Sequence, residues 1–249
     1  MEEIVNEAYH LFGNYKAQSP LDVCTDCCMD KKDEGLLASL PVKDIPKSLL
    51  MEYNDGAATE KTPINELKHF LPRYIELIGN FDFPTHSTEI ALKRLEPFNS
   101  EEWTSEEIEF LEKFSLTFFK KCISTYPLPE NEAIDSILIM FCRGQFKLTK
   151  ILNNWKSDKS LSSTLHFKDL YFNGFKQKNP SKMSSAFGEE EISKILRDWI
   201  DKKEVQIHFK ENIEKIIMDE VKLDEFDLSQ LNILYEILNQ TPHNNLYSA

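Results

Sequence analysis

The sequence predicts an all-α protein, either an irregular multi-helix bundle or a set of stacked helix pairs, with about eleven helices. Three observations support this fold class. The chain has only seven glycines in 249 residues, few segments alternate polar residues with Val, Ile or Thr, and apolar residues recur at spacings of three and four. We expect helices over residues 2–16, 20–39, 46–56, 63–79, 86–97, 105–125, 131–155, 163–176, 189–202, 206–221 and 227–239.

Capping residues mark the starts of three of these helices. Ser19-Pro20 and Thr62-Pro63 each place a capping hydroxyl before a proline, and Thr104 stands three residues before Glu107. Such pairs are typical of helix N-termini, because the hydroxyl accepts from a free amide and proline has no amide to satisfy.

The widest apolar stripes lie on the helices expected at 105–125 and 131–155. We expect these helices to pack as a central antiparallel pair joined by Pro127-Leu128-Pro129. The core residues would be Ile108, Leu111, Phe114, Phe118, Phe119, Cys122 and Tyr126 from the first, and Ile134, Ile137, Leu138, Phe141 and Cys142 from the second.

We expect a single all-α domain over residues 1–249. The clearest interruption is the segment 177–188, which is rich in small and polar residues and contains Pro180 and Gly188. It is either an ordinary loop, which we favour, or a boundary before a smaller C-terminal unit.

The chain is strongly acidic, with 42 acidic and 29 basic residues and a formal net charge of −13. Phosphate backbones are bound by cations, so this balance argues against nucleic acid and favours a basic protein partner, although acidity also serves solubility alone. No apolar run is long enough to span a membrane, and the first residues are acidic where a signal peptide is basic. We therefore expect a cytoplasmic protein whose five cysteines are reduced thiols.

Three of the five cysteines lie close together, in Val23-Cys24-Thr25-Asp26-Cys27-Cys28-Met29. If a helix begins at Pro20, their spacing places all three on one face. A structural zinc site needs four ligands, and with no second Cys-x-x-Cys pair the remainder would come from a distant residue such as His10 or His69. We favour thiols that serve as small buried hydrophobic groups, and we expect no zinc and no other cofactor. Metal binding and a redox or nucleophilic thiol are the alternatives.

A second unusual string, Leu67–Tyr74, places Pro72 inside a periodic helix. Proline lacks an amide and crowds the carbonyl four residues earlier, so we expect the helix to kink or restart, with His69 and Arg73 beside the distortion. A helix that bends to follow the core is the favoured interpretation, and a binding site is the other. The candidate functional cluster is Cys24, Cys27, Cys28, His69, Pro72 and Arg73.

Four stretches of the sequence carry a resemblance: Tyr15–Pro20, Val23–Met29, Asp44–Asn54 and His69–Arg73. Together they resemble a group of uncharacterised bacterial proteins that share a CTxCCM element followed by an HFLPR element. The resemblance covers roughly the first 95 residues. It implies no known activity and assigns no catalytic residue.

Motifs of common enzymes are absent from the sequence, including His-Glu-x-x-His, a glycine-rich phosphate loop and Gly-x-Ser-x-Gly. We therefore expect a non-enzymatic interaction module whose acidic surface binds and neutralises a basic protein partner such as a toxin, as an immunity protein does. Two alternatives stay open. One is a neutral helical adaptor, and the other is a metal- or thiol-dependent enzyme centred on Cys24, Cys27, Cys28 and His69.

Overall fold

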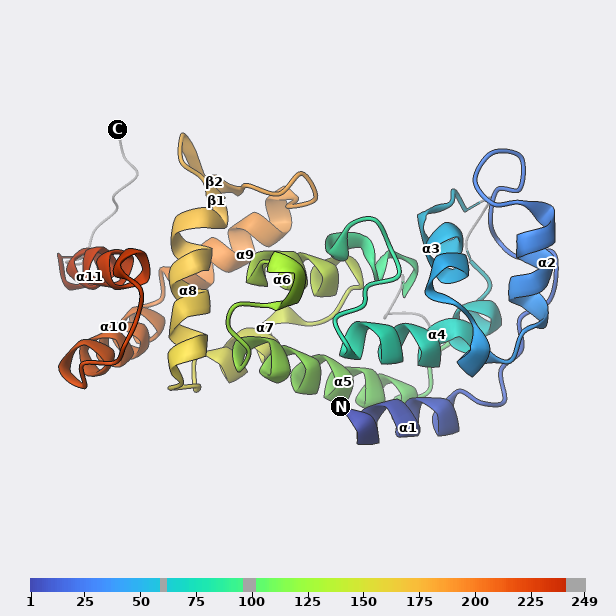
Figure 1. The fold of residues 1–249 in the computed structure, drawn as a ribbon, viewed down its shortest axis with the longest axis horizontal. Helices are drawn as coiled ribbons and strands as arrows, with labels where there is room; N and C mark the ends of the chain where they lie inside the picture. Colours follow the sequence, from blue (N-terminus) through green and yellow to red (C-terminus); the bar gives the residue numbers. More distant parts are fainter. Residues whose placement is uncertain (59–61, 96–101, 241–249) are drawn as a thin grey trace. The chain divides into compact units, whose positions relative to one another are not determined.

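The computed structural model describes residues 1–58, 62–95 and 102–240, and it confirms the all-α fold class (Figure 1). These residues form eleven α-helices, four short 3-10 helices and one two-stranded sheet. Their contacts divide the chain into two compact units. Unit 1 comprises residues 1–119 and 136–148, and unit 2 comprises residues 120–135 and 149–249.

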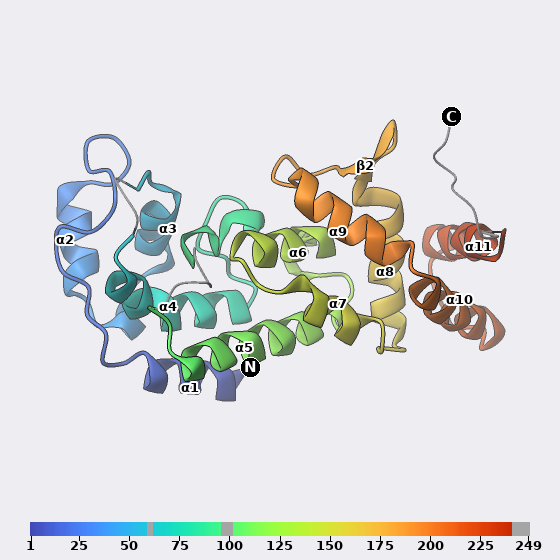
Figure 2. The same cartoon turned by 180° about the vertical axis from the view of Figure 1, so that it is seen from behind.

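Unit 1 is built from helices that pack in neighbouring pairs. Helix α1 lies along α4, and α2 lies beside α3 (Figures 1 and 2). The apolar stripe of α5 meets α6 as expected, because Phe141 contacts Phe114 and Phe118 with ring centroids 6.4 and 6.3 Å apart. The elements are α1 (Glu2–Leu11), α2 (Lys31–Ser39), η1 (Val42–Asp44), α3 (Lys47–Asp55), α4 (Ile64–Gly79), η2 (Thr88–Ile90), η3 (Lys93–Leu95), most of α5 (Ser105–Ile123) and most of α6 (Ile134–Arg143).

A buried ion pair ties α4 to α5 within unit 1. Lys68 and Glu107 lie 2.8 Å apart, with side chains only 3% and 2% exposed. Glu107 also accepts a hydrogen bond of 2.7 Å from the hydroxyl of Tyr15. A buried charge needs this kind of compensation, because desolvation of an isolated ion costs several kcal/mol.

Unit 2 has a core of stacked aromatic rings. Phe167 and Phe209 stack with centroids 3.8 Å apart, and Trp155 and Trp199 stack at 5.1 Å. Helix α10 packs against α8 and α11. The elements are the end of α5, η4 (Pro129–Asn131), the start of α6, most of α7 (Leu148–Trp155), α8 (Leu161–Asn173), β1 (Phe175–Lys176), β2 (Asn179–Met183), α9 (Glu190–Ile200), α10 (Lys203–Met218) and α11 (Glu225–Gln240).

The predicted start of α5 is confirmed in detail. The amide of Glu107 donates to the hydroxyl of Thr104 at 3.2 Å, and the amide of Thr104 donates to the carboxylate of Glu107 at 2.8 Å. These two bonds form the reciprocal capping box. The start of α4 falls within one residue of its prediction, but Thr62 does not cap it, since its hydroxyl donates to Asp22 instead.

The helix predicted over 20–39 is wrong in its first half. Helix α2 begins only at Lys31, where the carboxylate of Asp30 caps the amide of Lys32. Residues before it form turns, because the amides of Leu21 and Asp22 donate to distant carboxylates rather than starting a helix. Tertiary hydrogen bonds have overridden the local signal.

Two other predicted helices are divided. The helix expected over 131–155 is α6 and α7 with Gly144 between them, and a Cβ at Gly144 would lie 3.0 Å from that of Leu92. The helix expected over 86–97 is the pair of 3-10 helices η2 and η3, and residues 96–97 lie outside the described part of the chain.

The segment 177–188 contains β2 rather than only a loop. Strand β2 pairs with β1 in an antiparallel hairpin. Arg197 of α9 holds this hairpin, since its guanidinium donates to the carbonyl of Pro180 at 2.8 Å and lies 3.9 Å from the ring centroid of Phe175. Across the described residues, no helix combines the length and the apolar character needed to cross a membrane.

Candidate functional site

Three thiols converge on one turn of unit 1, which we call the cysteine turn (Val23–Met29). The sulfur of Cys27 lies 3.6 Å from the sulfur of Cys24 and 3.6 Å from that of Cys28. All three sulfurs lie within 4.8 Å of one another. The amide of Met29 donates to the carbonyl of Cys24 at 3.1 Å and closes the turn. A single short loop therefore presents all three sulfurs to the same point.

The cysteine turn corrects two expectations about these residues. They lie in a turn and not on a helix, and they are not buried core groups. Cys27 is exposed, and Cys24 and Cys28 are partly exposed. The backbone closes on itself between Cys24 and Met29, which brings the thiols together without helical spacing. The interpretation as small buried hydrophobic groups is therefore wrong for this cluster.

Buried hydrogen bonds fix the backbone that leads into the cysteine turn. The amide of Leu21 donates to Glu34 at 2.8 Å, and the amide of Asp22 donates to Glu66 at 3.1 Å. Leu21, Asp22, Glu34 and Glu66 are all buried. The amide of Cys24 then donates to the carbonyl of Ala57 at 2.8 Å. Carboxylates that accept from backbone amides make strong bonds, so the turn is held in one conformation.

Arg94 joins Asp22, the residue just before the cysteine turn, to the end of α3. Its guanidinium donates to the carbonyls of Asp22 (3.0 Å), Tyr53 (2.6 Å) and Gly56 (3.1 Å). It also donates to the hydroxyl of Thr62 at 3.1 Å and lies 4.2 Å from the ring centroid of Tyr53. Arg94 is 8% exposed. The fork geometry of arginine suits this role, because one side chain can serve several carbonyls at once.

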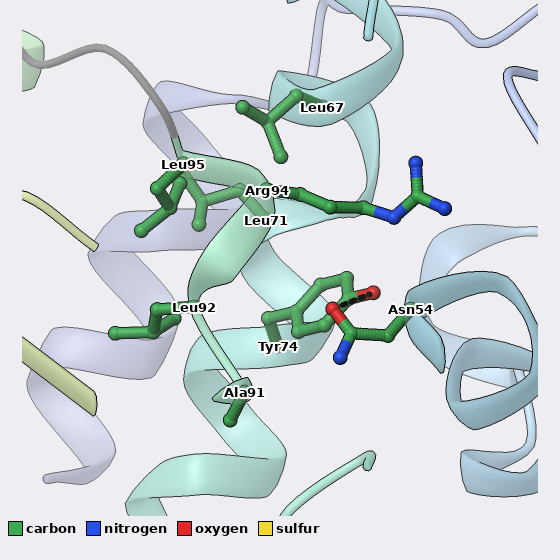
Figure 3. Close-up of a pocket in the computed structure, with 8 residues that line it drawn as sticks. All are labelled: Asn54, Leu67, Leu71, Tyr74, Ala91, Leu92, Arg94 and Leu95. Carbon is green, nitrogen blue, oxygen red and sulfur yellow. Dashed lines mark hydrogen bonds between the residues drawn. The ribbon is translucent and has the colours of Figure 1, made fainter. Parts of the chain in front are cut away.

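A small hollow lies beside Arg94. Figure 3 shows Leu92 and Leu95 on one side of it and Arg94 and Asn54 on the other, with the hydroxyl of Tyr74 directed at Asn54. The two groups are joined by a hydrogen bond of 3.4 Å. The free space is about that of a single water molecule. The hollow is therefore too small to hold a substrate.

Gly56 permits the close approach of α3 to the cysteine turn. A Cβ at this position would lie 2.7 Å from Cγ2 of Val23, 2.9 Å from the carbonyl oxygen of Glu52 and 3.3 Å from Cβ of Cys28. All three distances are shorter than ordinary van der Waals contact, and at the first two an atom would have to shift. Only glycine fits here without a shift of the turn.

Two of the three thiols, those of Cys24 and Cys27, differ in acidity. The backbone amides of Asp26 and Cys27 hydrogen-bond to the thiol of Cys24 and hold its pKa below the ordinary value. Hydrogen bonds with Cys28 and Cys24 raise the pKa of Cys27 to about 11. Since the thiolate is the reactive and metal-binding form, Cys24 is converted to it more readily than Cys27.

His69 and Arg73 serve the scaffold rather than the cysteine turn. Nδ1 of His69 lies 2.9 Å from the carbonyl oxygen of Tyr15, so this nitrogen carries the proton and donates it. Burial lowers the pKa of His69 below its ordinary value, with the Tyr15 carbonyl acting in the opposite direction. Arg73 donates to the carbonyl of Ile45 at 2.9 Å and pairs with Glu76 at 2.7 Å.

The structure therefore separates the candidate cluster into parts. Cys24, Cys27 and Cys28 form a group of possible metal ligands, and among the described residues no His, Asp or Glu joins that group. Helix α4 runs through Pro72 from Ile64 to Gly79, so the helix does not restart there.

The sequence did not reveal the residues that hold the cysteine turn. These are Glu34, Glu66, Arg94, Tyr53 and Gly56. Their partners lie up to 72 residues away in the chain. The one signal in the sequence that could have pointed to Arg94 is the scarcity of arginine, because the chain has only four arginines.

The chain was compared with protein-family models, with curated proteins and with solved structures, and none of them matches it. We therefore interpret the cysteine turn from its own geometry.

Proposed function

We propose that the protein is a non-enzymatic interaction module that binds a basic protein partner through the acidic surface of unit 1, and that it neutralises this partner as an immunity protein does. The supporting observation is the uneven distribution of charge. Unit 1 has 23 acidic and 13 basic residues, a net charge of −10, whereas unit 2 has 19 acidic and 16 basic residues, a net charge of −3.

Exposed glutamates lie on two helices of unit 1, α1 and α5. The end of α1 meets the start of α5, because Phe12, the residue after α1, contacts Phe110 with ring centroids 5.7 Å apart. An excess of one charge on a surface speeds association with an oppositely charged protein, and the attraction is screened over about 8 Å at physiological salt. The exposed glutamates at and just before the starts of these helices are Glu2, Glu3, Glu102, Glu106 and Glu109.

The proposal is tested first by capture of a partner from the cells that make the protein, and then by association kinetics. The intact chain serves as bait at low ionic strength, and each captured protein is identified by mass spectrometry. We expect a basic partner whose association rate constant falls as salt is added, because steering is electrostatic. A partner whose association rate is independent of salt contradicts the proposal.

Two matched triple variants locate the contact surface. Glu102→Gln, Glu106→Gln and Glu109→Gln together remove three exposed charges from unit 1. Glu189→Gln, Glu190→Gln and Glu191→Gln remove three exposed charges from unit 2. We expect the first variant to slow association by at least about threefold at low salt and the second to leave it nearly unchanged. Equal effects of the two variants contradict a contact through unit 1.

The neutral helical adaptor has one observation in its favour. Three large apolar residues of unit 2 are well exposed: Met218 at 75%, Phe226 at 67% and Ile233 at 50%. A partner bound through apolar contacts would associate at a rate that salt and the glutamine variants leave unchanged. The kinetic experiment therefore separates the two functions.

A further inference from the structure

We propose that Cys24, Cys27 and Cys28 form a three-thiolate site for a thiophilic metal ion, with a fourth position open to an exchangeable ligand. This proposal replaces the expectation from the sequence that no zinc is bound, because the structure exposes the three thiols and brings them together. This inference is independent of the proposed partner binding, because it rests on the cysteine turn alone.

The sulfur positions match the requirement of one ion. A tetrahedral zinc ion with metal–sulfur bonds of about 2.3 Å separates its sulfurs by about 3.8 Å. Cys27 already lies 3.6 Å from both other sulfurs. The pair Cys24 and Cys28 is at most 4.8 Å apart and has to close by no more than about 1 Å. Small side-chain rotations achieve this while the backbone stays in place.

The turn is preorganised for such a site. The backbone that leads into it, at Leu21 and Asp22, is anchored on the buried residues Glu34, Glu66 and Arg94, while its thiols stay accessible. Metal sites owe their affinity to ligands that the surrounding structure already holds in place. An ion can therefore enter from solvent without a rearrangement of the fold.

The donor set selects the ion. Three sulfur ligands favour zinc or copper(I) and disfavour magnesium and calcium, which prefer oxygen. Asp26 and Asp30 are exposed and lie close to the cysteines in the sequence, and they add to the negative potential that attracts a cation. Three thiolates leave one position of a tetrahedral ion free, which is the arrangement of sites that exchange a ligand.

A disulfide is the competing use of these thiols. It would join only two of the three sulfurs, and Cys27 lies at the same distance from both of its neighbours. A disulfide would therefore leave one accessible thiol without a role. Binding of one ion uses all three.

Zinc retention by the full-length protein tests the proposal. The reduced chain, freed of any histidine tag, is loaded with one equivalent of Zn²⁺, passed through a desalting column and weighed by native mass spectrometry. We expect one zinc per chain. Failure of the wild-type protein to retain zinc overturns the proposal.

Cysteine variants identify the ligands. Cys27 is exposed, so Cys27→Ala should leave the far-UV circular dichroism spectrum unchanged. In competition with a chromogenic chelator, its zinc affinity should fall by more than about 100-fold, since loss of an outer partner alone costs 10- to 100-fold. The control Cys142→Ala removes a thiol outside the turn and should bind like the wild type. Affinity within tenfold of wild type for Cys27→Ala overturns the proposal.

Cobalt(II) reports on sulfur ligation directly. The wild-type protein loaded with Co²⁺ should show thiolate-to-cobalt charge-transfer absorption, and the variant with Cys24→Ala, Cys27→Ala and Cys28→Ala should show none. Absorption of equal intensity in the triple variant would place the metal elsewhere and overturn the proposal.

Discussion

Replacement of Arg94 by methionine tests the network that holds the cysteine turn. Methionine nearly fills the volume of the side chain, so the change removes the charge and the donors without opening a large cavity. The carbonyls of Asp22, Tyr53 and Gly56 each lose a donor. The buried carboxylate of Asp22, 3.7 Å from the guanidinium, loses its cation. Every one of these groups lies in unit 1.

The expected cost follows from these losses. A buried carbonyl left without a donor costs about 1–3 kcal/mol, and removal of one member of a buried ion pair costs about 3–5 kcal/mol. The effects are not additive, so we expect Arg94→Met to lower the free energy of unfolding by about 3–5 kcal/mol. Arg94→Lys keeps the positive charge but loses the planar guanidinium that serves several carbonyls at once. It should therefore lower the free energy of unfolding by less than the methionine variant does.

Urea denaturation followed by far-UV circular dichroism measures this change. Lys194→Met is the matched control, because Lys194 and Asp198 form an ion pair with side chains 74% and 59% exposed. This control should cost no more than about 0.5 kcal/mol. Hydrogen exchange at the amide of Cys24, which donates to Ala57, should also become faster in Arg94→Met. A cost below about 1 kcal/mol for Arg94→Met would refute the role given to this network.

Two further predictions concern Gly56 and Glu107. Gly56→Ala should destabilise the protein by about 1–3 kcal/mol, because the new Cβ would clash with Val23. Gly35→Ala should stabilise it by about 0.5–1 kcal/mol, because Gly35 lies inside α2 with open space around its Cβ. Equal effects of the two variants in urea denaturation would contradict this steric account. Burial raises the pKa of Glu107, but hydrogen bonds from Lys68 and Tyr15 outweigh it and hold this pKa below the ordinary value. The unfolded chain therefore takes up the proton first, so the stability contributed by Glu107 is complete above about pH 5 and is lost as the pH falls through the lowered pKa. The stability difference between wild type and Glu107→Gln should shrink over that range, and a difference that is constant from neutral to acidic pH would contradict the prediction.

The sequence predicted those parts of the fold that local interactions determine. Helix α4 was expected over 63–79 and spans Ile64–Gly79, and the capping box at Thr104 starts α5 as expected. Apolar periodicity and capping act within a few residues, so both can be recognised from the sequence alone.

The cysteine turn could not be predicted in the same way. Its conformation depends on Glu34, Glu66 and Arg94, which lie 13, 44 and 72 residues from the groups they bind. The hairpin β1–β2 likewise depends on Arg197, 17 residues beyond Pro180. The capping signal at Ser19-Pro20 predicted a helix, but hydrogen bonds to residues distant in the sequence hold this segment in turns instead. The clustering of the cysteines was visible in the sequence, but their exposure was not.

X-ray absorption at the zinc edge of the zinc-loaded protein tests the three-thiolate site most directly, because it counts the sulfur atoms around the ion. We expect three sulfur neighbours at about 2.3 Å and one lighter neighbour in the fourth position. A first shell that consists of nitrogen and oxygen alone would contradict a site built from Cys24, Cys27 and Cys28.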